Sequence, residues 1–278
     1  MFYPVAFNNI FHPADFTEGD QGAFSHALKI ALSGKSRLDL LHVEPRGEES
    51  RWSDFPSVRS TVERWGLAPE GSHRRDVLSL GIDIKKVVRE GADIGTRILD
   101  YIESEEPDLV VLATHQRSGP ASWIQKALAA RITRESKTLS LITPRRSLGF
   151  VSSETGAVQL RHVLIPYDRD PSPARAFEAL TSLTQLLGVR ELEVSLFHVG
   201  AEDAAPPVHI PEVPGWKIEK TFWDGDVVDH ILDAAENRNS DLIVMATHGR
   251  HGALDAWRGS VTERVIRGAR CPILAVPA

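Results

Sequence analysis

The sequence predicts an α/β protein made of two tandem doubly wound (Rossmann-like) domains. Each would hold a five-stranded parallel sheet of order 3-2-1-4-5, and the two would pack as a pseudo-twofold pair. The main observation is an internal repeat, because DLVVLATH at 108–115 returns as DLIVMATH at 241–248, 133 residues later. Within each copy, short β-branched runs alternate with longer amphipathic runs, which is typical of β-α-β units. The length of 278 residues also suits two such domains.

The extent of the repeat sets the expected domain boundaries. The offset continues without a gap from Arg117 and Arg250 to Pro144 and Pro277. The segment between the copies is rich in Ser, Gly and Thr and lacks apolar periodicity. We therefore expect a degenerate N-terminal domain at 1–146, a linker at 147–157 and a second domain at 158–278.

In the N-terminal copy, the first strand should end at Pro13-Ala-Asp15, the counterpart of Pro166-Tyr-Asp168. Gly34-Lys-Ser36 follows a helical pattern rather than a strand, so we interpret it as a helix stop and not as the end of a P-loop. An insertion at 51–81 is where the copies diverge most. The remaining elements are a strand around 41–43, a helix with Ile94, Ile98, Leu99 and Ile102 on one face, and strands at 108–114 and 139–143.

The C-terminal copy shows the same order with clearer boundaries. A strand at 162–166 is followed by Ser172-Pro173, a pair that suits the start of a helix. That helix carries an apolar stripe of Phe177, Leu180, Leu183 and Leu187. Strands are expected at 192–199 and 218–222, and Gly225-Asp226 turns into a helix with Val227, Val228, Ile231, Leu232 and Ala235 on its apolar face. A strand at 242–246, a helix at 261–267 and a strand at 272–276 complete the copy.

Composition and charge exclude several classes of protein. The formal net charge of −6 argues against a protein that wraps nucleic acid. No apolar run approaches the ~20 residues needed to cross a bilayer, and the first 16 residues do not resemble a secretion signal. The single cysteine, Cys271, cannot form an internal disulfide, and we expect it to lie buried beside the last strand. A soluble cytoplasmic protein with no membrane or nucleic-acid partner is expected.

The loop after the 242–246 strand has the features of a phosphate cradle. Ala246-Thr-His-Gly249 is separated by nine residues from Gly259-Ser260-Val-Thr262. Glycine lets backbone amides approach an anion closely, and the positive end of the following helix dipole favours negative charge. In open parallel sheets, ligands bind beyond the carboxyl ends of the strands, where Asp168 would lie across the crevice. A carboxylate there can accept a hydrogen bond from a ribose hydroxyl or an adenine amine.

At these residues the chain resembles the universal stress protein family in its tandem arrangement, over nearly its whole length. The family's ATP-binding pattern is Gly, two residues, Gly, nine residues, then Gly followed by Ser or Thr. Gly249, Gly259 and Ser260 match it, whereas Ala246 replaces the first glycine. The resemblance implies a site for ATP, with magnesium as a potential companion ion, and pairing of the last strands of the two domains. The implied nucleotide-binding residues are Pro166, Tyr167, Asp168, Val199, Met245, Ala246, His248, Gly249, Gly259, Ser260, Val261 and Thr262.

The N-terminal copy departs from this pattern. Gln116 stands where Gly249 does, and Lys126-Ala127 replaces Gly259-Ser260. Side chains would then occupy the space that a phosphate needs, so we expect this copy to have lost the ligand and to serve as a scaffold. Asp15 is retained, but an aspartate at a strand end is commonly a turn former.

The predicted function is a cytoplasmic stress-response or regulatory protein that binds ATP or a related adenine nucleotide through its C-terminal domain. It would hydrolyse ATP slowly at most, with no catalytic residues, and could pair as a homodimer. The alternative is a nucleotide-free scaffold or sensor that binds another ligand, such as a metal at the second-domain histidines. No paired metal-ligand spacing is present among the histidines. A shared structural role for His42, His115, His198 and His248 is the competing interpretation.

Overall fold

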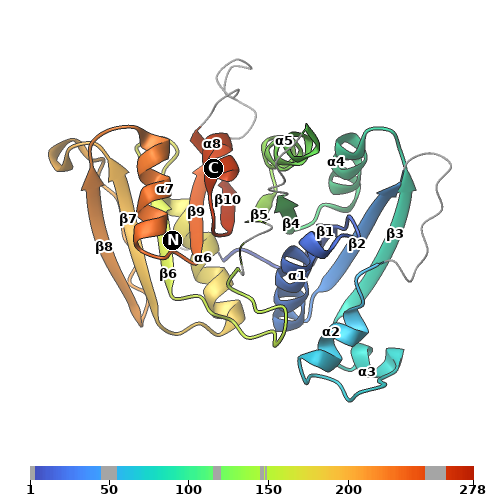
Figure 1. Ribbon diagram of the computed structural model, residues 1–278. Helices are drawn as coiled ribbons and strands as arrows, with labels where there is room; N and C mark the ends of the chain where they lie inside the picture. Colours follow the sequence, from blue (N-terminus) through green and yellow to red (C-terminus); the bar gives the residue numbers. More distant parts are fainter. Residues whose placement is uncertain (1–3, 45–54, 115–119, 145–146, 148, 248–260) are drawn as a thin grey trace.

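A computed structural model describes residues 4–44, 55–114, 120–144, 147, 149–247 and 261–278. Its strands form one ten-stranded sheet of order β3-β2-β1-β4-β5-β10-β9-β6-β7-β8. Each half of this sheet has the order 3-2-1-4-5 with parallel neighbours, as predicted. In Figure 1 the strands β1 to β5 lie on the right and β6 to β10 on the left. We call β1 to β5 with their helices the N-terminal half, and β6 to β10 with theirs the C-terminal half.

The N-terminal half contains an additional helical segment between its second and third strands. There, α2 and α3 lie within the insertion predicted at 51–81 and pack near the lower end of β3 (Figure 1). Phe55, Val62, Trp65 and Val77 of this segment are buried in the core. The elements are β1 (Asn9–Pro13), α1 (Gln21–Gly34), β2 (Arg37–Glu44), α2 (Val58–Arg64), α3 (Arg74–Leu78), β3 (Asp83–Glu90), α4 (Ile94–Glu105), β4 (Leu109–Thr114), α5 (Pro120–Glu135) and β5 (Leu139–Pro144), with a 3-10 turn at Glu18–Asp20.

The C-terminal half follows the predicted order element by element. Its members are β6 (His162–Pro166), α6 (Ala174–Leu187), β7 (Leu192–Val199), β8 (Trp216–Trp223), α7 (Val227–Asn237), β9 (Leu242–Thr247), α8 (Val261–Gly268) and β10 (Ile273–Pro277), with a 3-10 turn at Glu202–Ala204.

The two halves meet at their last strands. β10 pairs with β5 antiparallel, with Leu274 opposite Leu141 and Ile273 opposite Ile142. On one face of the sheet α1 packs against α6, and on the other α5 packs against α8. These are the strands that the family resemblance implied as neighbours.

The core forms two layers, one on each face of the continuous sheet. One layer contains side chains of α1 and α6, such as Phe24 and Phe177, together with Leu109 and Val111 of β4. The other contains side chains of α4, α5, α7 and α8, with Val110 and Leu112 of the same strand. Alternate residues of one strand therefore serve opposite layers, as the two-residue period of a β-strand requires. Each layer includes residues from both halves.

The segment predicted as a linker is packed into this core. Phe150 and Val151 are fully buried. Their backbone amides donate to Nε2 of His26 in α1, at 3.1 and 3.2 Å, while His26 Nδ1 contacts the carbonyl of Gly22 at 2.7 Å. The Trp65 indole donates to the Ser153 carbonyl at 3.0 Å. The segment thus ties the insertion to α1, although its composition suggested only a connection.

Two expected core positions are wrong. Ile94 and Val227 were predicted on the apolar faces of their helices, yet they are 47% and 40% exposed. Both residues directly follow an aspartate N-cap, Asp93 or Asp226, whose side chain accepts backbone N–H groups of the first turn. The first helical residue lies at the open end of the helix, so periodicity alone overestimates its burial. The helix stop at 34–36 is confirmed, with Lys35 in the left-handed conformation at the end of α1.

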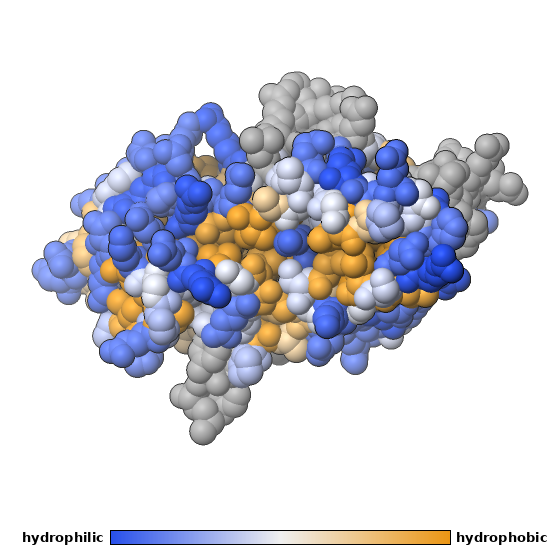
Figure 2. Space-filling view, turned by 90° about the horizontal axis from the view of Figure 1, so that it is seen from below, coloured by the Kyte–Doolittle hydropathy of each residue, from blue (hydrophilic) through white to orange (hydrophobic). Residues whose placement is uncertain are grey.

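The two outermost strands carry charged residues. β3 includes Lys85, Lys86 and Arg89, and β8 includes Lys217, Glu219 and Lys220. Seen from below, the surface is largely hydrophilic at its left and right ends, and hydrophobic areas gather nearer the middle (Figure 2). Charged edge strands disfavour pairing with a strand of another chain.

Candidate nucleotide site at the carboxyl ends of β6 and β9

The sheet topology brings several predicted site residues to one edge. β6 ends at Pro166 and is followed by Tyr167 and Asp168, and it lies between β7 and β9. The connection after β6 leads to β7 on one side of it, whereas β9 lies on its other side. Such a switch point in an open parallel sheet is where a ligand crevice is expected, here between the carboxyl ends of β6 and β9. The residues that share this edge are Pro166, Tyr167 and Asp168 after β6, Val199 at the end of β7, and Met245 and Ala246 near the end of β9.

The phosphate-binding part of the predicted motif can be followed only in part. Val261 is exposed and Thr262 is buried at the start of α8, directly after the predicted cradle. The remaining predicted residues, His248, Gly249, Gly259 and Ser260, lie outside the described residues, as does the counterpart segment at Gln116.

Asp168 is an exposed carboxylate at this edge. Within the described residues, its carboxylate accepts one hydrogen bond, from the backbone N–H of Arg169 at 2.7 Å. A carboxylate with free lone pairs at the end of the first strand of a half-sheet can accept hydrogen bonds from a polar ligand.

Tyr167 and Met245 are largely buried at this edge of the sheet. The backbone N–H of Tyr167 donates to the Phe197 carbonyl at 2.9 Å, and its carbonyl lies 3.1 Å from Nδ1 of His198. Its side chain is 7% exposed, and burial, with the nearby charges of Asp168 and Glu202, raises the pKa of its phenol. Met245 is 5% exposed. These two side chains are packed in the core, so their contacts with a ligand would be apolar or through the backbone.

The corresponding edge of the N-terminal half is occupied by its own side chains. Oδ1 of Asp15 accepts hydrogen bonds from the backbone N–H and the hydroxyl of Thr17, at 2.9 and 2.6 Å. The Phe16 ring stacks on His42 with a centroid distance of 3.8 Å, and Phe55 of the insertion packs edge-on against Phe16 at 4.8 Å. Asp15 is therefore a turn former, as expected. The sequence pattern did not indicate either ring, since Arg169 stands at the position equivalent to Phe16 and Phe55 lies in the unrepeated insertion.

Several of the histidines that the structure describes have structural partners. Nδ1 of His42 lies 2.8 Å from the Ala14 carbonyl, which matches the contact of His198 with the Tyr167 carbonyl. His162 lies at the opposite end of β6 from Asp168, 3.3 Å from Glu193. In the part of the chain that the structure describes, no three His, Cys, Asp or Glu side chains gather as a metal site. Burial raises the pKa of Cys271 to about 12, which keeps its thiol protonated near neutral pH.

Some repeated polar residues serve the fold rather than the site. Oδ2 of Asp241 accepts the backbone N–H groups of Arg161 and His162, and Asp108 does the same for Asn8 and Asn9. Both aspartates therefore bind the beginning of the first strand of their half. The equivalent positions of Asp108 and Asp241 in the two copies thus reflect a structural role and not ligand binding.

Comparisons with known proteins agree with this architecture. The model of the universal stress protein family matches residues 6–143 and 211–277. Universal stress protein Sll1654 of Synechocystis is 28% identical over 155 residues, covering 49% of this chain and 96% of that protein. Universal stress protein MJ0531 of Methanocaldococcus jannaschii is 44% identical over 62 residues, 22% of this chain and 36% of its own length, so the match spans about a third of that relative.

Similarity of fold extends further than similarity of sequence. The crystal structure of a universal stress protein from Archaeoglobus fulgidus covers 97% of this chain and 98% of its own, with a TM-score of 0.60 and 18% identity. Among the described residues, no helix combines the length and apolar character needed to span a membrane. The family match over most of the chain, together with the fold, shows that this chain belongs to the universal stress protein family.

Proposed function

We propose that the C-terminal half binds ATP or a related adenine nucleotide at the carboxyl ends of β6 and β9, and that binding serves a regulatory role in a cytoplasmic stress response. The observation that carries this proposal is the contrast between Asp168 and Asp15. Asp168 is exposed beyond the end of β6. Asp15 is engaged by Thr17, next to the stacked rings of Phe16 and His42. One half offers a free carboxylate where ligands bind in such sheets, and the other does not.

The remaining contacts are those that the family resemblance implies. Pro166, Tyr167, Val199 and Met245 would flank the base and ribose together with Asp168. Gly249, Gly259 and Ser260 would hold the phosphates, with His248, Val261 and Thr262 beside them. Bare glycine backbone suits a phosphate because amide groups can approach it closely. Ala246 adds one methyl group at the first position of the pattern, which we expect to lower affinity without abolishing it.

The proposed role is binding rather than catalysis. A phosphate cradle stabilises the ground state and the transition state by overlapping contacts, so slow hydrolysis at most is expected. Bound nucleotide would change the surface of the protein, and the protein would act through this change, either as a single chain or as a homodimer.

Calorimetric titration of the full chain with ATP and magnesium tests this proposal. We expect one site per chain. Asp168→Ala should weaken binding at least about tenfold, because it removes a hydrogen-bond acceptor that a bound ribose or adenine would use. Asp15→Ala is the matched control in the other half and should leave the affinity unchanged.

A second pair of variants tests the phosphate part separately. Gly259→Val should abolish binding because its side chain blocks the approach of the phosphates to the backbone, whereas Ala127→Val should have no effect. Equal losses from both changes, or two ATP sites per chain, would refute a single C-terminal site.

A further inference from the structure

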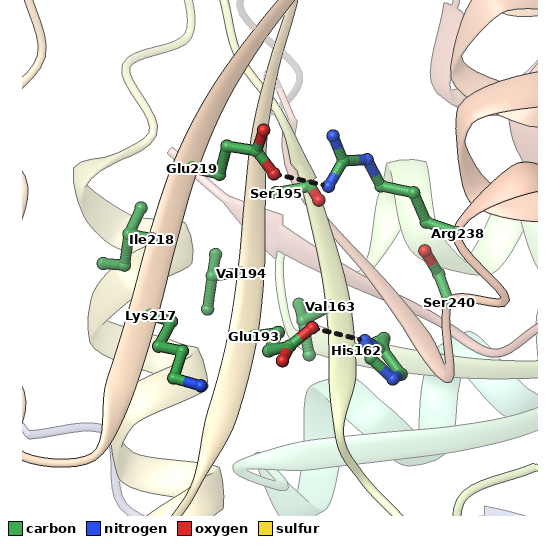
Figure 3. Close-up of a pocket in the computed structure, with 10 residues that line it drawn as sticks. All are labelled: His162, Val163, Glu193, Val194, Ser195, Lys217, Ile218, Glu219, Arg238 and Ser240. Atoms are coloured by element: carbon green, nitrogen blue, oxygen red, sulfur yellow. Dashed lines mark hydrogen bonds and ion pairs between the residues drawn. The ribbon is translucent and has the colours of Figure 1, made fainter.

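The C-terminal half has a groove at the end of its sheet opposite to the nucleotide site. It has a volume of about 460 Å³. It lies near the amino ends of β6, β7 and β8, next to the last turn of α7 (Figure 3). His162 is the first residue of β6, and Glu193 and Lys217 are each the second residue of their strands. The lining residues are His162, Val163, Glu193, Val194, Ser195, Lys217, Ile218, Glu219, Arg238 and Ser240.

The N-terminal half fills the corresponding place. Strand register makes Arg37 equivalent to Glu193 and Asp39 equivalent to Ser195. There, Arg37 donates two hydrogen bonds to Asp39 at 2.7 and 2.8 Å, and the Tyr101 hydroxyl donates to Asp39 at 2.8 Å. Asp39 is fully buried as a result. Tyr101 and the half-buried Arg37 thus cover the Asp39 carboxylate and close this end of the sheet.

The groove arises because these filling side chains are absent from the C-terminal half. The 133-residue offset places Ala234 of α7 where α4 has Tyr101. Replacing a phenol by a methyl group and a carboxylate by the Ser195 hydroxyl removes the contacts that close the N-terminal half. The structure leaves this space open rather than filling it with other side chains.

The charges around the groove are also exchanged. In the N-terminal half, Lys85 of β3 pairs with Glu105 of α4 at 2.8 Å. At the equivalent positions of the C-terminal half, Glu219 of β8 pairs with Arg238 at the end of α7 at the same distance, so the acidic and basic residues have changed places. The Arg238 guanidinium lowers the pKa of Glu219, which keeps that carboxylate ionised. Glu193 contacts His162, while Lys217 forms no ion pair within the described residues. Figure 3 shows Lys217 and Glu193 on neighbouring strands at the lower part of the groove.

From this arrangement we infer that the groove binds a small zwitterion of the α-amino acid class, whose carboxylate pairs with Lys217 and whose ammonium group pairs with Glu193. The two residues are in direct register on β7 and β8. Residues in register on adjacent strands project from the same face with their backbones about 4.8 Å apart, so one small ligand can contact both charged groups. Lys217 and Arg238 balance Glu193 and Glu219, so the groove favours a ligand of no net charge over a simple anion.

A thermal-shift screen of the full chain against each of the twenty L-amino acids at millimolar concentration tests this inference, followed by calorimetry with those that stabilise it. At least one amino acid should raise the melting temperature, because a ligand that binds only the folded state stabilises it. Sodium acetate and methylammonium chloride, each carrying one of the two charges, should give a much smaller shift. No stabilisation by any amino acid, or an equal shift with acetate, would overturn the inference.

Three variants locate the site. Lys217→Glu should weaken binding by about tenfold or more, because it replaces the cation by a repelling charge. Lys220→Glu is the control with the same charge change. Lys220 lies three residues after Lys217 on β8, and because side chains alternate along a strand it projects from the opposite face. Ala234→Tyr should close the groove as Tyr101 closes the other half. Circular dichroism checks that each variant is folded, and equal losses in Lys217→Glu and Lys220→Glu would place the binding elsewhere.

Discussion

At the scale of single residues, two buried histidines of the N-terminal half have opposite electrostatic environments. Burial lowers the pKa of His26 to about 4, while its Nε2 accepts two backbone N–H groups of the linker. His12 is buried as well, and desolvation lowers its pKa. The Asp20 carboxylate, 3.2 Å from its Nε2, together with the Val111 carbonyl and Asp15 outweighs this effect, so the pKa of the imidazole is raised. Neither histidine has a histidine counterpart in the repeat, so the sequence did not distinguish their roles.

The pKa of His26 predicts a loss of stability in mild acid. The unfolded chain takes up a proton at this histidine near pH 6.5, whereas the folded chain does so only near pH 4. The free energy of unfolding should therefore fall by up to about 3 kcal/mol between these values and then level off. His12 acts in the other direction, because its raised pKa adds stability that is lost as the pH rises through that value.

Urea unfolding of the wild-type protein and of His26→Gln between pH 7.5 and pH 4 separates this contribution. Glutamine can still accept from the linker amides but does not titrate, so the variant should show a shallower loss of stability on acidification. His209→Gln replaces an exposed loop histidine and should follow the wild-type curve. Identical pH dependence of all three proteins would show that His26 is not protonated on unfolding.

At the scale of elements, the strands and helices were predicted well where the repeat was strong and poorly where it was interrupted. β4, β9 and their neighbours follow from hydrophobic pattern and β-branched composition, which reflect local physical preferences. α2, α3 and β3 were not predicted, because the insertion has no second copy to compare and its helices are short. Phe55 belongs to this insertion, and Phe16 has Arg169 at its equivalent position, so the packing of the two rings at the N-terminal site depends on tertiary contacts that leave no repeated signal.

The repeated aspartates predict equal effects in the two halves. Asp241→Ala and Asp108→Ala each remove an acceptor that binds two backbone N–H groups at the start of a strand, at distances of 2.6–3.0 Å. Each variant should lower the free energy of unfolding by roughly 1–3 kcal/mol, measured by urea denaturation at pH 7. Asp100→Ala is a suitable control, because Asp100 makes a surface ion pair with Arg97 that should contribute little. A loss no larger than that of the control would contradict a structural role.

At the scale of the whole molecule, the continuous sheet joins two halves that the sequence presented as separate repeats. Strand order within each half was predictable, since it follows from the β-α-β pattern and the family resemblance. The buried linker and the two shared core layers were not, because contacts between distant segments leave no periodic signal. Phe150 and Val151 illustrate this, since a segment rich in polar residues places its two apolar side chains at full burial.

The shared core and the β5–β10 pairing predict that the two halves unfold together. Leu141 and Leu274 face each other across this junction, and both are almost fully buried. Leu141→Ala and Leu274→Ala should each cost about 2–5 kcal/mol, and their effects should be coupled because the residues are in direct register. The matched control pair is Leu38→Ala with Leu196→Ala. These residues lie on β2 and β7, in opposite halves and seven strand spacings of about 4.8 Å apart, so their effects should be additive.

Tryptophan fluorescence reports on Trp65 in one half and on Trp216 and Trp223 in the other. If the halves unfold together, it should show a single transition that coincides with the loss of circular dichroism. Two separate transitions, each shifted only by the substitution in its own half, would contradict joint unfolding and would mean that the two halves are independently stable.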